Sequence, residues 1–181
     1  MTMFNYKKID NFLEKDFCDF IVDYFIMKTN FSIESSNDKN NLLKYFHYSD
    51  FLVETILQNS MIFVREIVQE DLYPSYTYSG IYTEGDKVDP HKNKKSEKIE
   101  GILFFGSKSG KQKIYLSDKD DCSDSNCFEL NAGDLLLFNG HKYWHWSDNL
   151  DIKWSIFSFL YYTDDVNLIY DEREYLGFPQ K

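Results

Sequence analysis

The sequence lacks any apolar run approaching the roughly 18 residues of a membrane-spanning helix, and no charged segment leads into an apolar stretch at its start. It therefore predicts a soluble, unexported protein of the cytoplasm. Internal repeats and linkers rich in proline or glycine are also missing. Because the 181 residues hold only three prolines and eight glycines, residues 1–181 are predicted to form a single domain.

Cysteine is scarce as well, and its three residues do not make a disulfide framework. Cys122 and Cys127 flank a loop at a spacing longer than that of most zinc knuckles, and no further ligands are evident nearby. Cys18 falls on a predicted helix, where it reads as a small buried hydrophobe. We expect three reduced thiols, as is usual in a cytosolic compartment.

Positive charge is in the minority, with 20 Lys and Arg against 30 Asp and Glu and a formal net charge of −10. The average field of such a chain repels polyanions. The only basic cluster comprises Lys92, Lys94, Lys95 and Lys98. Nucleic acid is therefore not expected as a partner, whereas a small-molecule or peptidyl substrate is compatible with this charge.

Aromatic residues are abundant, at 18% of the chain, which predicts a folded core. Apolar residues recur at intervals of three and four over residues 13–25, which predicts a first helix capped by Asp10 or Asn11. A second amphipathic helix is predicted over residues 51–68. The polar stretch 32–44 between them is predicted to be a surface loop.

After Pro74 the pattern changes to that of β-strands. Tyr76, Tyr78 and Tyr82 fall at even positions, the period of a strand with one buried face. Short apolar segments separated by glycine-containing turns follow at residues 102–105, 113–116, 127–130, 135–138 and 154–162. Two helices followed by such strands predict an α+β, mainly β fold, with the helices packed on an antiparallel sandwich or barrel.

Three of the four histidines lie in this β-rich half. His91 and Asn93 would share one face of an extended strand and point into a barrel mouth. Further along, Gly133-Asp134 precedes an apolar strand, and His145 and Lys153 follow it in that order.

This ordered set, together with Tyr82 and Gly85, resembles the 2-oxoglutarate-dependent Fe(II) oxygenases, particularly their prolyl-4-hydroxylase-like branch. That family carries Tyr-x-x-Gly, then His-x-Asp, a Gly-Asp strand, a distal His and a following Lys or Arg. Residues 9–18 look like the family's first helix, so the resemblance covers nearly the whole chain. It implies a double-stranded β-helix, or jelly roll, with two or more N-terminal helices packed on one sheet.

The resemblance also implies a metal site in which His91 and His145 bind Fe(II) and Asn93 takes the third protein position. His141 is an alternative distal ligand, but His145 keeps the family's spacing to the following lysine. His47, in the helical half, is interpreted as a surface or packing residue.

A cosubstrate site is implied in the same way. The keto acid of 2-oxoglutarate would take two open positions on the iron, and O₂ the third. Lys153 and Ser155, on one strand face, would hold the far carboxylate. Tyr82, or alternatively Tyr78, would hydrogen-bond to the same cosubstrate.

Position 93 departs from the family, because Asn is a neutral and weaker oxygen donor than the usual Asp. Asn93 could still coordinate through its carbonyl oxygen and support hydroxylation of an unactivated C–H bond. Alternatively, chloride could take the vacated position, as in related halogenases, or Asp89 or Glu97 could substitute. A further alternative is a catalytically impaired relative, a barrel that binds a ligand without turnover.

Each of these residues also has a plain structural interpretation. His145, beside Tyr143, Trp144 and Trp146, could be part of a packed aromatic cluster, and Lys153 could be a solvated strand residue. A cupin-like domain would also use barrel histidines, but it would offer a closer His-x-His pair and a Glu before the distal His, and neither is seen. The ordered set therefore favours the oxygenase hypothesis.

Overall fold

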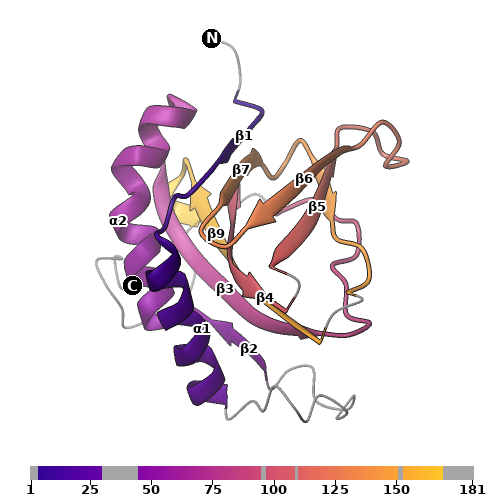
Figure 1. Ribbon diagram of the computed structural model, residues 1–181. Helices are drawn as coiled ribbons and strands as arrows, with labels where there is room; N and C mark the ends of the chain where they lie inside the picture. Colours follow the sequence, from indigo (N-terminus) through magenta and orange to yellow (C-terminus); the bar gives the residue numbers. More distant parts are fainter. Residues whose placement is uncertain (1–3, 30–44, 95–96, 109, 151–152, 169–181) are drawn as a thin grey trace.

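The computed structural model describes residues 4–29, 45–94, 97–108, 110–150 and 153–168. Within these ranges two α-helices lie against a sandwich of two β-sheets (Figure 1), and a short 3-10 helix spans Val166–Leu168. The α+β, mainly β class predicted from the sequence is confirmed. The predicted loop at 32–44 lies outside the described residues.

The two sheets are antiparallel at every described pairing. The larger sheet has the order β1 (Tyr6–Ile9), β7 (Leu135–Asn139), β4 (Ile99–Ser107), β9 (Trp154–Thr163), β3 (Tyr73–Thr83), β2 (Phe46–Tyr48). The smaller sheet has the order β6 (Asn126–Asn131), β5 (Lys111–Ser117), β8 (Trp144–Trp146). The strand predicted at Tyr76–Tyr82 and the five predicted after it are found, but the extended strand predicted at His91 and Asn93 is not. The three short strands β1, β2 and β8 are additional.

The helices α1 (Lys15–Thr29) and α2 (Phe51–Val68) cover one face of the larger sheet (Figure 1). The bounds of α2 agree with the prediction. Asp50 caps its N-terminus by accepting hydrogen bonds from the backbone N–H groups of Leu52 and Val53. Neither helix in the described ranges is long and apolar enough to cross a membrane.

The start of α1 differs from the prediction. The helix begins at Lys15, so the predicted cap at Asp10 or Asn11 is wrong. Asp10 forms an ion pair with Lys8 at 2.6 Å instead. Asn11 has a φ of 50°, and its backbone N–H donates to Asp134 at 3.0 Å. Both residues therefore belong to the turn that joins β1 to the helix.

Alternating residues of the larger sheet build two separate cores. On β9, Ile156 and Leu160 pack against the helices, whereas Phe157, Phe159 and Tyr161 face the smaller sheet. This second core, between the sheets, is rich in aromatic side chains. It forms one wall of the site described below.

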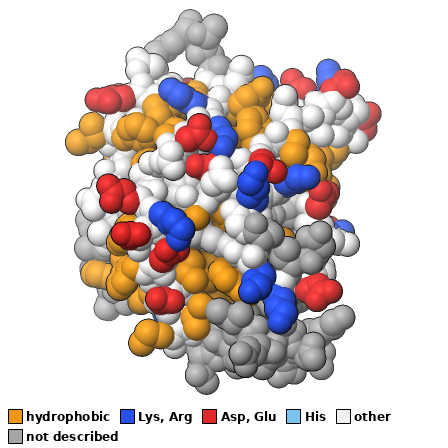
Figure 2. Space-filling view, viewed as in Figure 1, with side chains coloured by type: hydrophobic (Ala, Val, Ile, Leu, Met, Phe, Trp, Pro, Cys, Tyr) orange, Lys and Arg blue, Asp and Glu red, His pale blue; other side chains and the backbone are white. Residues whose placement is uncertain are grey.

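Side chains of both charges are distributed over the surface. Figure 2 shows Lys and Arg interspersed with Asp and Glu on one face, with apolar side chains between them. The exposed apolar residues include Phe20 and Met27 on α1 and Phe51 and Ile62 on α2. This face has no continuous basic patch, in keeping with the net charge.

Candidate functional site

Two histidines from distant segments meet at the smaller sheet. His145 lies on β8 and is fully buried. His91 lies before β4, where the N–H of each histidine donates to the carbonyl of the other, at 3.0 and 3.3 Å. The centroids of their rings are 4.0 Å apart. The structure thus brings the two predicted imidazoles together. The sequence predicts His91 in an extended strand, but in the structure this residue forms only an isolated bridge to His145.

The segment that carries His91 is held in place by further backbone hydrogen bonds to the chain after β8. The N–H of Ser147 donates to Val88 O at 3.1 Å, and the N–H of Leu150 donates to Asp86 O at 2.9 Å. These bonds explain why a segment outside the sheets presents its imidazole to β8.

The hydrogen bonds of the rings leave one nitrogen of each imidazole free. Nδ1 of His91 lies 2.8 Å from the carbonyl of Asp89, and Nδ1 of His145 lies 3.4 Å from that of Tyr143. With the proton assigned to Nδ1, each Nε2 keeps a lone pair. Nε2 of His145 is buried and has no hydrogen-bond partner among the described residues.

Both imidazoles are held in the neutral form that binds metals. Burial lowers the pKa of His145 to about 4. His91 is exposed toward a cavity, but partial desolvation and the neighbouring His145 lower its pKa below the ordinary value. A neutral imidazole offers its lone pair without first losing a proton.

A buried acid, Glu100, lies beside the two histidines and was not among the residues predicted from the sequence. Glu100 lies on β4 and is fully buried. Its Oε2 is 3.3 Å from His145 Nε2, within ion-pair distance but without hydrogen-bond geometry. Its Oε1 has no hydrogen-bond partner in the described part of the chain. Burial raises the pKa of this carboxyl to about 8.

Asn93 contacts Glu100 and not the imidazoles. Its Nδ2 donates to Glu100 Oε2 at 2.6 Å and to the carbonyl of Glu97 at 3.3 Å. Its backbone N–H donates to Gly140 O at 3.0 Å. A Cβ at Gly140 would overlap the Asn93 amide, so the close approach of these segments depends on that glycine.

The donor set suits a divalent transition metal. Imidazole nitrogens and a carboxylate oxygen are ligands of iron in oxygenases, and the site contains an unpartnered buried atom of each kind, His145 Nε2 and Glu100 Oε1. Among the described residues no three His, Cys, Asp or Glu side chains form a ready-made cage. An ion would therefore have to draw these side chains together.

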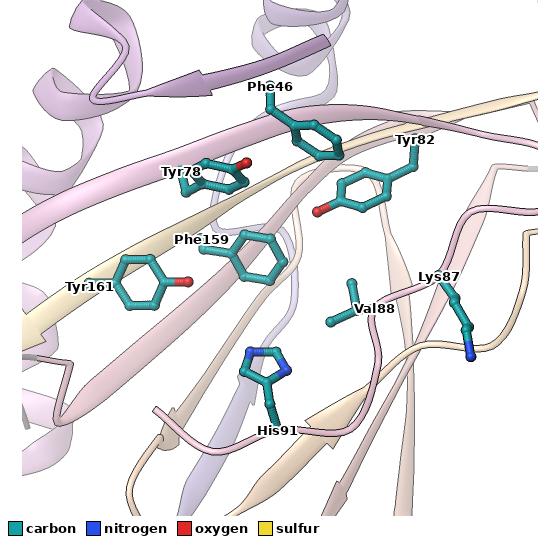
Figure 3. Close-up of a pocket in the computed structure, with 8 residues that line it drawn as sticks. All are labelled: Phe46, Tyr78, Tyr82, Lys87, Val88, His91, Phe159 and Tyr161. Carbon is teal, nitrogen blue, oxygen red and sulfur yellow. The ribbon is translucent and has the colours of Figure 1, made fainter. Parts of the chain in front are cut away.

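A cavity of about 300 Å³ adjoins the histidines (Figure 3). The imidazole of His91 points into it, as do the hydroxyl groups of Tyr82 and Tyr161. Lys87 lines the rim, but its ammonium group points away and pairs with Asp89 at 2.7 Å. The remaining lining residues are Phe46, Tyr78, Val88 and Phe159.

The predicted cosubstrate residues are only partly brought together. Tyr78 and Tyr82 line the cavity, and the Tyr82 ring stacks on Phe157 at 4.2 Å between centroids. Ser155 is buried, but its hydroxyl donates to Gln112 Oε1 at 3.1 Å. Lys153 is exposed, and neither it nor Ser155 is among the residues that line the cavity.

The other candidate ligands lie apart from the pair. His141 is exposed, with Nε2 2.7 Å from Lys94 O. Asp89 is exposed, and Glu97 accepts hydrogen bonds from the Tyr76 hydroxyl and the Lys94 N–H.

The remaining histidine and the cysteines are also accounted for. His47 lies on β2 against the ring of Phe25, 5.7 Å between centroids, which fits the predicted packing role. Cys18, Cys122 and Cys127 are free thiols, and Cys18 is buried as predicted.

Comparisons with known proteins identify the fold. No protein-family model matches the sequence, and no curated protein sequence matches it. Solved structures do match. A viral collagen prolyl hydroxylase from Paramecium bursaria Chlorella virus-1, in complex with 2-oxoglutarate, has a TM-score of 0.62 at 12% identity, covering 87% of this chain and 94% of that one. The fold is that of the 2-oxoglutarate and Fe(II) oxygenases.

Two further structures support this assignment. HygX from Streptomyces hygroscopicus, with nickel and 2-oxoglutarate bound, has a TM-score of 0.64 at 8% identity, covering 89% of this chain and 83% of that one. A prolyl-4-hydroxylase from Pseudomonas putida has a TM-score of 0.60 at 11% identity, covering 87% and 92%. At such identities the likeness shows the oxygenase fold alone.

Proposed function

We propose that this protein is an Fe(II)- and 2-oxoglutarate-dependent oxygenase on a jelly-roll scaffold that hydroxylates a C–H bond of its substrate. The observation that carries the proposal is the convergence of His91 and His145, 4.0 Å apart between ring centroids, beside a cavity in an oxygenase fold. Each imidazole keeps one nitrogen free for a metal. A sheet with a purely structural role would not need two histidine side chains to face each other in this way.

The residues of this chain would hold and orient the metal. His91 and His145 would bind it through Nε2, and the Nδ1 contacts to the carbonyls of Asp89 and Tyr143 would fix each ring. Bound iron would supply the binding and activation of O₂. The aromatic wall formed by Phe157, Phe159 and Tyr161 would limit the access of water.

Support for 2-oxoglutarate comes from the structural neighbours, since HygX and the viral prolyl hydroxylase have both been solved with it. In this chain the groups that face the cavity are the hydroxyls of Tyr82 and Tyr161 together with His91. The cavity lining has no inward-pointing cation, because the Lys87 ammonium points away. Hydroxyl groups would therefore have to bind the far carboxylate.

We further propose a small molecule or a peptidyl side chain as the substrate, because the net charge of −10 opposes binding of nucleic acid. A cytoplasmic location stays a prediction.

Anaerobic addition of Fe(II) and then 2-oxoglutarate tests the proposal. A weak visible charge-transfer band is expected if both bind together at this site, and succinate release on admitting air is expected from turnover. The band without succinate would instead identify the catalytically impaired relative. No band in the wild-type protein, and no change in it on His145→Ala, would contradict the assignment of the site.

A further inference from the structure

We infer that Glu100 is the carboxylate ligand of the metal site and that Asn93 is its positioning residue. The inference rests on the proposed metal-dependent function. It places the negative charge of the site on β4, on a residue that follows the predicted His-x-Asn motif, and it gives Asn93 the role of a hydrogen-bond donor.

The orientation of the Asn93 amide supports this assignment. Its Nδ2 lies between two acceptors, Glu100 Oε2 at 2.6 Å and the Glu97 carbonyl at 3.3 Å. An amide nitrogen has no lone pair to give to a metal. Asn93 therefore presents a donor to the carboxylate, and this contact leaves Glu100 Oε1 without a partner among the described residues.

The surroundings of Glu100 fit a cation. The side chain is fully buried, and the ionised form of a carboxyl group in such a position is costly, so that the group ionises only when a positive charge accompanies it. No ion pair with Lys or Arg is found for Glu100 in the described ranges. A divalent ion between Glu100, His91 and His145 would provide that charge.

Other nearby acids are less suited to the role. Both oxygens of Glu97 accept hydrogen bonds, from the Tyr76 hydroxyl and the Lys94 N–H. Asp89 is exposed and paired with Lys87. Among these three acids, Glu100 alone lies within 3.3 Å of an unpartnered imidazole nitrogen.

Titration of the metal-free protein with Co(II), followed by calorimetry and by visible absorption, tests the inference. Glu100→Gln keeps the shape and removes the charge, and we expect it to weaken Co(II) binding by more than the roughly 10–100-fold typical of outer-shell changes. Glu97→Gln is the matched control, since it removes a neighbouring charge that is not a ligand, and its loss should stay under about 10-fold.

Asn93 is tested by two further variants. Asn93→Ala should weaken Co(II) binding by about 10–100-fold and alter the visible Co(II) spectrum, because Glu100 loses its orienting donor. The exchange Asn93→Asp with Glu100→Gln should recover part of the affinity lost in Glu100→Gln. If Glu100→Gln does not fold, as judged by circular dichroism, the Asn93→Ala spectrum alone decides.

The outcomes distinguish a failure of the proposed function from a failure of the Glu100 assignment. Wild-type protein that binds no Co(II) would overturn the proposed function and this inference together. Wild-type protein that binds Co(II), with Glu100→Gln binding equally well, would overturn only the role of Glu100. An Asn93→Ala variant with unchanged affinity and spectrum would overturn the positioning role.

Discussion

This site differs from the expected His-x-Asp motif in a single group, because an amide at position 93 replaces the carboxylate. Asn93 has the position of the expected acid, yet its side chain is turned to Glu100 at 2.6 Å. A substitution to Asp at position 93 alone would place two carboxylates side by side, and like charges at that distance repel. The effect of a substitution at Asn93 therefore depends on Glu100, and the effect of a substitution at Glu100 depends on Asn93.

Asp134 offers a residue-scale prediction about stability. It is 1% exposed, pairs with Lys8 at 2.8 Å, and accepts from the backbone N–H groups of Asn11 and Asn131. Its burial alone would raise the pKa, but the hydrogen bonds from Lys8 and the two N–H groups outweigh it, and the pKa is lowered. We expect Asp134→Asn to lower the free energy of unfolding at pH 7 by about 1–3 kcal/mol.

The pH dependence of this effect follows from the direction of the shift. A carboxyl whose pKa is lower in the folded state stabilises above its unfolded pKa, about 3.9, and loses that contribution as pH falls through the folded value. Urea unfolding of Asp134→Asn and wild type should therefore differ less at pH 3 than at pH 7. An equal difference at both values would show that the ion pair contributes nothing.

Only some of the site residues could be predicted at this scale. The resemblance of the ordered motifs to those of the Fe(II) oxygenases was sufficient to predict that His91 and His145 meet. Glu100 was missed because the inward face of β4 is set by its register with β7 and β9. A signal was present, since Glu100 alternates with the apolar residues Ile102 and Phe104, where an acid is unusual. Lys153 precedes the first residue of β9, so strand alternation did not fix its direction.

At the element scale, the contact between β2 and β3 shapes the cavity. Phe46 is paired with Gly80, and a Cβ at Gly80 would overlap the ring of Phe46. Phe46 lines the cavity beside Tyr78 and Tyr82. The Phe46 ring can therefore occupy this position in the cavity wall because Gly80 has no side chain.

Gly80→Ala should therefore displace Phe46. We expect a loss of about 1–3 kcal/mol in the free energy of unfolding, as for other overpacked positions, and weaker binding of any ligand in the cavity. Gly106→Ala is the control, because a Cβ there would be at an ordinary 3.4 Å from Val22. Equal stability of the two variants in chemical denaturation would contradict this reading of the β2–β3 contact.

The long elements were readable from the sequence, and the short ones were not. The helix α2 has 18 residues, a clear amphipathic pattern and the capping Asp50, so that its ends could be predicted. The strand β8 has only three residues, too few to display alternation. Its position depends on pairing with β5, which is a long-range interaction. For the same reason the partner strand of His145 could not be named beforehand.

At the scale of the whole molecule, metal binding should raise stability, because a ligand that binds only the folded state adds RT ln(1 + [L]/Kd). At a free Co(II) concentration of 100 times Kd this amounts to about 2.7 kcal/mol. For a chain of this size we expect the melting temperature to rise by about 5–10 °C. Differential scanning calorimetry with and without Co(II) measures the shift, and excess chelator should reverse it.

Mg(II) is the matched control for that shift. It prefers oxygen ligands, whereas imidazole suits iron and cobalt. An equal rise with Mg(II) would indicate general binding to the acidic surface and would speak against a histidine site. No rise with Co(II) would count against any metal at His91 and His145.

The hydrogen bonds between His91 and His145 also have a consequence for biosynthesis. His91 is synthesised well before His145. Strand β9 is synthesised after both, and it lies between β4 and β3 at the centre of the larger sheet. A nascent chain that ends before Thr163 lacks part of β9 and hence the complete larger sheet, which contacts His145 through Glu100 and Phe138. A metal at the proposed site would therefore be bound only after β9 has been made and paired, and its uptake would depend on the metal that is available after that point.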